Sequence, residues 1–73
     1  MVLYKESARK HGYNERDIER VLDHPITTTE GNARDGSLMV VKTGFASNAD
    51  HIEVFYQYHP RSGEPVVFHA QKC

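Results

Sequence analysis

The chain has 73 residues, of which 38% are hydrophobic and 26% are charged, and this length and composition predict one folded domain spanning residues 1–73. Nine basic and ten acidic side chains give a formal net charge of −1. This charge argues against nucleic-acid binding through bulk positive charge. Any such binding would need a local basic patch. The lone cysteine, Cys73, excludes an internal disulfide and a cysteine-rich zinc site.

A short helix is predicted over the first ten residues. Its less polar positions recur at helical spacing, at Met1, Tyr4, Ala8 and His11. Gly12 follows at a point where helices commonly end in a left-handed turn. Residues 1–4 fit an extended arm equally well, so the start of this helix stays open.

A second helix is predicted over residues 14–23. Asn14 is a favoured N-cap residue, and acidic side chains in the first turn suit the exposed amide hydrogens there. An apolar stripe at helical spacing is formed by Ile18, Val21 and Leu22. The helix must end near Pro25, because the residue before a proline is pushed out of the helical region.

Four strands are predicted after the second helix, over residues 26–29, 37–45, 51–58 and 65–70. The third shows regular alternation, with one face formed by Ile52, Val54, Tyr56 and Tyr58. Short connections between consecutive strands predict an antiparallel meander, one face of which the helices must cover. The predicted fold is therefore α+β, with two N-terminal helices packed on a four-stranded antiparallel sheet in the order ααββββ.

Two histidines are candidates for proton transfer. His11 ends the first predicted helix, where an imidazole is favourable for purely structural reasons. In that place it could also act as a general acid or base beside Arg9 and Lys10, whose charges could hold a phosphate. His69 lies on the less apolar face of the last strand, where it is either simply exposed or part of a site.

Further candidates lie on neighbouring strands and in a hairpin loop. Three residues could share a site with His69, although strand register cannot be read from sequence: Glu53, Lys42 and Tyr58. Tyr56 and Tyr58 belong either to the edge of the core or to a surface on which bases stack. Arg61, in the loop before the last strand, is either a solvated charge or a phosphate contact.

No catalytic motif of specific spacing is present, since GxxxxGK[ST], GxGxxG, GxSxG and HExxH are all missing. His51 and Glu53 could share a cation on one strand face, but such a pair is more often a solvated sheet face, and we expect no metal and no cofactor. The absence of a long apolar run and of a signal-peptide core predicts a cytoplasmic protein without membrane contact.

The order of these segments resembles a known family. The opening ESARKHG, the helix NERDIERVLDHP and a final strand ending in VVFHA are similar to the BrnT-like toxins of the RelE/ParE superfamily, which belong to type II toxin–antitoxin systems. The resemblance covers about residues 6–70. Within it, Lys10 and His11 match a KHG motif, and His69 matches the histidine of the terminal strand.

The resemblance implies a metal-independent endoribonuclease, in which the 2′-hydroxyl of RNA attacks the neighbouring phosphate, and a DNA-binding antitoxin that holds it inactive. It implies a catalytic group formed by His11, His69 and Lys10. RNA or phosphate binding is expected at Arg9, Arg61, Lys42 and Tyr58. Two other functions remain open: a protein-binding module that pairs through its sheet, and a domain that binds nucleic acid without cutting it.

Overall fold

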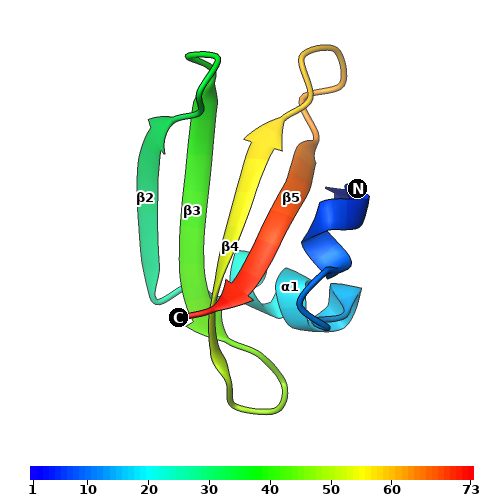
Figure 1. The fold of residues 1–73 in the computed structure, drawn as a ribbon, viewed down its shortest axis with the longest axis vertical. Coiled ribbons are helices and arrows are strands. Elements are labelled where there is room, and N and C mark those ends of the chain that lie inside the picture. Colours follow the sequence, from blue (N-terminus) through cyan, green and yellow to red (C-terminus); the bar gives the residue numbers. More distant parts are fainter.

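The computed structural model describes all residues from Met1 to Cys73. It contains one α-helix, one 3-10 turn and five strands (Figure 1). In chain order these are β1 (Leu3–Tyr4), η1 (Glu6–Arg9), α1 (Glu15–Asp23), β2 (Thr27–Asn32), β3 (Leu38–Phe45), β4 (His51–Tyr58) and β5 (Pro65–Lys72). No helix has both the length and the apolar character needed to cross a membrane.

The strands form a single mixed sheet in the order β1-β5-β4-β3-β2. Strands β2 to β5 pair as antiparallel neighbours, whereas β1 runs parallel to β5, with Leu3 opposite Val66 and Tyr4 opposite Val67. The fold remains α+β, but the predicted arrangement of two helices on a four-stranded antiparallel sheet is wrong. The structure has one α-helix and a fifth strand in its place.

The N-terminal segment explains this correction. Residues 3 and 4 extend along the free edge of β5, and the amide of Lys5 continues the pairing by donating to Val67 O at 2.8 Å. A helix beginning at residue 1 would lose these edge hydrogen bonds. What remains of the predicted first helix is the four-residue turn η1, which buries Ala8 completely against the core.

The helix α1 begins and ends close to its predicted bounds. The Asn14 side chain caps it by accepting a hydrogen bond from the amide of Asp17 at 2.9 Å. Ile18 and Val21 are fully buried and face the sheet. The helix lies on one side of the sheet, and no helix lies across the opposite side (Figure 1).

The two faces of the sheet therefore differ. The face under α1 supplies most of the core, with buried side chains from Val40, Ile52, Val54, Tyr56, Val67 and Ala70. Strand alternation places the other side chains on the open face, which no element covers. There Phe45 is 51% exposed and lies against the ring of His51, with the ring centroids 5.2 Å apart.

A buried carboxylate ties α1 to the loop between β3 and β4. Asp17, only 7% exposed, accepts hydrogen bonds from the hydroxyl of Ser47 and from its amide, the latter at 3.0 Å. Hydrogen bonding by Ser47, its hydroxyl first, lowers the pKa of Asp17 below the ordinary value despite the opposing effect of burial.

We expect Asp17→Asn to be less stable than the wild type at neutral pH and equally stable in acid. Because the folded-state pKa of Asp17 lies below its unfolded value of about 3.9, its charge stabilises the fold fully above that pH. This contribution is lost as the pH falls through the folded-state pKa. Urea unfolding of both proteins at steps from about pH 6 to about pH 2 measures it. A difference in unfolding free energy that persists unchanged into acid would contradict the expectation.

Candidate active site

The structure brings His11 and His69 together although they lie at opposite ends of the chain. Their ring centroids are 5.3 Å apart, and the rings meet edge to face at 83°. His11 is exposed and His69 is half-buried. Two imidazoles at this separation can act on one substrate as proton donor and proton acceptor.

The position of His11 follows from the way the chain leaves the sheet edge. After β1 has paired with β5, η1 continues along the same edge, and Ser7 Oγ donates to Phe68 O at 2.5 Å. The chain then turns at Gly12, whose φ of +84° is a left-handed conformation that favours glycine. This turn directs the chain back toward α1 and leaves His11 beside β5.

The position of His69 depends on an irregularity in the sheet. Tyr56 of β4 lies opposite Val67, but the adjacent Phe55 lies opposite His69, so Phe68 is an extra residue in β5. Such bulges re-aim the side chains next to them. As a result His69 lies on the open face, where its ring packs against Phe55 with centroids 5.2 Å apart.

Two polar side chains extend from His69 across the open face. His69 Nε2 lies 2.9 Å from Gln71 Oε1, and the amide nitrogen of Gln71 in turn donates to Glu53 Oε1. Glu53 and Gln71 are directly opposite each other on β4 and β5. The three residues form a continuous hydrogen-bonded chain, which we call the Glu53–Gln71–His69 chain.

The predicted cations Arg9 and Lys10 directly precede His11 in the sequence, and they differ in whether other side chains hold them. The Arg9 guanidinium pairs with Glu15 and lies 5.7 Å from the centre of the Tyr4 ring. Lys10 is exposed and forms no ion pair. Of these two cations, Lys10 is therefore the one whose charge is free to meet a phosphate.

The Tyr4 hydroxyl group is held in a way that keeps the cation–π contact between Tyr4 and Arg9 in place. It donates to Glu19 Oε2 at 2.9 Å, and burial together with this hydrogen bond raises the pKa of Tyr4 well above its usual range. The ring under Arg9 thus stays a neutral phenol with its π face available to the cation.

Three other predicted site residues lie away from the histidines. Lys42 points to the side of the sheet that α1 covers, where its Nζ donates to Leu22 O at 3.0 Å. Tyr58 lines the same small hollow of about 220 Å³ as Lys42 and stacks edge-on against Tyr56 at 5.6 Å. Arg61 is exposed in the β4–β5 hairpin loop, which precedes β5 (Figure 1), whereas His69 lies within that strand.

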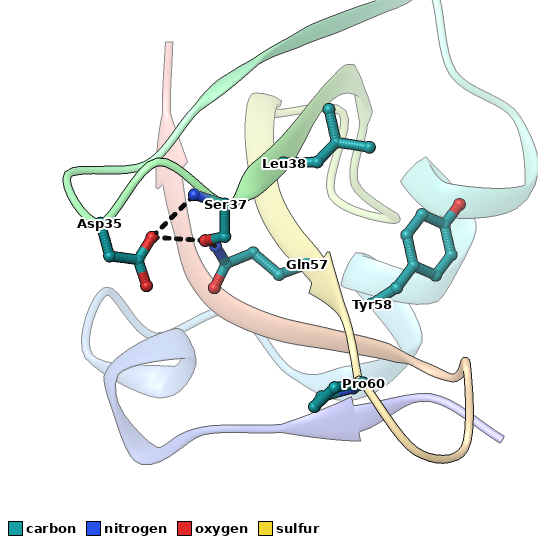
Figure 2. Close-up of a pocket in the computed structure, with 6 residues that line it drawn as sticks. All are labelled: Asp35, Ser37, Leu38, Gln57, Tyr58 and Pro60. Atoms are coloured by element: carbon teal, nitrogen blue, oxygen red, sulfur yellow. Dashed lines mark hydrogen bonds between the residues drawn. The ribbon is translucent and has the colours of Figure 1, made fainter.

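A second hollow, of about 390 Å³, lies where β3 begins and β4 ends (Figure 2). Asp35 accepts from the amide of Ser37 at 3.0 Å and from its hydroxyl, and these bonds lower the pKa of Asp35. Gln57 completes the group by donating to Ser37 Oγ at 2.6 Å. These polar groups hydrogen-bond with one another and so stabilise the β2–β3 turn. The rest of the wall is formed by Leu38, Tyr58 and Pro60.

The sequence did not identify the role of Gln71, and it placed Glu53 only in general terms near His69. The signal that could have found Gln71 is alternation, because residues 69 and 71 must share a strand face. The bulge at Phe68 leaves no comparable mark in the sequence.

We found neither a metal-binding group at this site nor a related protein of known function. The structure contains no group of three or more histidine, cysteine or acidic residues placed to hold a metal ion. Comparison of the chain with protein-family models, with curated proteins and with solved structures found no match.

Proposed function

We propose that this protein is a metal-independent endoribonuclease in which His11 and His69 transfer the protons. The observation that carries the proposal is the pairing of their rings, with centroids 5.3 Å apart, on an otherwise open sheet face. Lys10, which directly precedes His11 in the sequence, is exposed and forms no ion pair. RNA is the substrate class that such a site suits, because its own 2′-hydroxyl is the nucleophile and the protein needs to supply only protons and charge.

The proposed reaction is a transesterification within the RNA strand. One imidazole takes the proton of the 2′-hydroxyl as its oxygen attacks the adjacent phosphorus. The bond from phosphorus to the 5′-oxygen of the next nucleotide breaks, and the second imidazole gives that oxygen its proton. The products are a 2′,3′-cyclic phosphate and a 5′-hydroxyl end. Lys10 would offset the negative charge that grows on the phosphate oxygens in the transition state.

The resemblance to BrnT-like toxins extends the proposal to the biological setting. It supports messenger RNA as the substrate, the cytoplasm as the location and a DNA-binding antitoxin as the partner that restrains the enzyme. The net charge of −1 argues against an extended electrostatic contact with RNA, so the proposed contact is a short one.

The test is incubation of the purified chain with single-stranded RNA of mixed sequence in the presence of a metal chelator. We expect fragments that carry 2′,3′-cyclic phosphate and 5′-hydroxyl ends. Expression of the chain in bacteria should arrest growth. RNA that stays intact beside a protein shown to be folded would overturn the proposal.

Exposed aromatic rings on the open face favour a second candidate, the binding of single-stranded nucleic acid without cleavage. Phe45 and His51 form one such pair of rings, and Phe55 lies further along the same face. Bases stack on exposed aromatic side chains with little regard to sequence. Equal affinity for RNA and DNA of one sequence, with no cleavage of either, would favour this function over the first.

A further inference from the structure

We propose that the Glu53–Gln71–His69 chain fixes one tautomer of His69, the form protonated at Nε2, so that Nδ1 is the atom that accepts the proton. The catalytic use of this tautomer rests on the proposed ribonuclease function. The tautomer itself is a property of the folded protein that can be measured without RNA.

The carboxylate of Glu53 determines the direction of the hydrogen bonds. An ionised Glu53 can only accept hydrogen bonds, so the group of Gln71 that contacts it must be the amide nitrogen. The oxygen of the same amide is then the atom that faces the imidazole, at 2.9 Å from Nε2. Since that oxygen is also only an acceptor, Nε2 must carry a hydrogen.

The sheet holds this chain in place. Glu53 and Gln71 sit opposite each other across β4 and β5, and Gln71 and His69 share one face of β5. All three side chains are half-buried, which reduces competition from water. Phe55 packs against the imidazole at 5.2 Å and restricts its rotation.

The two histidines are therefore not equivalent. Neutral His69 presents a free lone pair at Nδ1, which suits it to accept the proton of the 2′-hydroxyl. His11 has no hydrogen-bond partner for its ring and no fixed tautomer, and its imidazolium form suits it to protonate the departing 5′-oxygen. Glu53 and Gln71 are positioning residues, because they act through His69 and touch no reacting atom.

Long-range ¹H–¹⁵N correlation spectra of the imidazole rings test the proposal directly. They are recorded on the full ¹⁵N-labelled chain at alkaline pH, where imidazole is neutral, and His69→Ala identifies the signals of His69. We expect wild-type His69 to be protonated at Nε2 alone. In Glu53→Gln the new amide can donate or accept, so Gln71 is free to turn over and both tautomers should appear.

The matched control is Glu30→Gln, the same chemical change on β2, on the strand at the far edge of the sheet. It should leave the spectrum of His69 unchanged. A wild-type His69 that is protonated at Nδ1 or that mixes both tautomers would overturn the proposal. A folded Glu53→Gln variant with the wild-type spectrum would overturn it as well.

Kinetics separate this proposal from the proposed function. If the wild type cleaves RNA, Glu53→Gln should lower kcat in proportion to the fraction of His69 that leaves the Nε2-protonated form, about twofold for an equal mixture, and leave KM unchanged, because the RNA contacts are intact. An unchanged kcat together with mixed tautomers would overturn the catalytic role of the chain. A wild type that does not cleave RNA would overturn the ribonuclease function, whereas the spectra would still decide whether the tautomer is fixed.

Discussion

His69→Ala should lower the rate of RNA cleavage by at least about 100-fold, because a positioned general acid or base contributes roughly 10²- to 10⁴-fold. His11→Ala should produce a loss of similar size. The double variant should be little slower than either single variant, since the two groups act in one concerted proton transfer. Single-turnover cleavage of a labelled RNA measures all three rates.

His24→Ala is the matched control for these variants. His24 is exposed at the C-terminal end of α1, where its backbone oxygen lies beside Gly44 of β3, and its truncation to alanine should leave the rate within about twofold of the wild type. Retention of the wild-type rate by either folded His11→Ala or folded His69→Ala would refute the proposed role of the pair.

Ile18→Ala should remove about 2–5 kcal/mol from the free energy of unfolding, the usual cost of truncating a fully buried isoleucine. Ile18 is 0% exposed and joins α1 to the core. A chain of this size has a stability near the low end of the range of about 5–15 kcal/mol. The variant should therefore keep only about 0–3 kcal/mol of stability and unfold at a clearly lower temperature than the wild type.

Ile26→Ala supplies the comparison, because the same atoms are removed from a side chain that is 56% exposed. Its cost should stay within about 0.5 kcal/mol. Urea unfolding followed by circular dichroism gives both values. Equal destabilisation by the two substitutions would contradict the core assigned to this fold.

The parts of the fold that depend on local signals were predictable from sequence. The helix α1 carries its own cap at Asn14 and its own apolar stripe, and the alternation in β4 separates its two faces, although it does not show which of them is buried. The N-terminal segment was not predictable in this way. Its choice between helix and strand is made by Val66 and Val67 at the other end of the chain, and a two-residue strand is too short to show a period.

The sequence was enough to predict which residues are candidates for the site, but not which of them lie close together in space. The contact between His11 and His69 requires both the parallel pairing of β1 and the bulge at Phe68, which are long-range features. Lys42 shares a strand face with the buried Val40, but the sequence could not show that this face is the buried one, because Val40 and Val41 are both apolar.

The open face of the sheet explains why so few residues are buried. With α1 covering only one face, aromatic side chains such as Phe45 remain in contact with solvent. In the proposed enzyme this exposed surface is where a strand of RNA would lie. The same surface would be available to an antitoxin, whose binding would then compete with RNA.

The most direct measurement uses a DNA oligonucleotide that contains a single ribonucleotide, incubated with the wild-type chain and a metal chelator. Cleavage should occur only on the 3′ side of the ribonucleotide and leave a 2′,3′-cyclic phosphate, because only that sugar carries the attacking hydroxyl. His69→Ala should cut the oligonucleotide at least about 100-fold more slowly. An oligonucleotide that the folded wild-type chain leaves uncut, or an all-DNA strand that it does cut, would contradict the account.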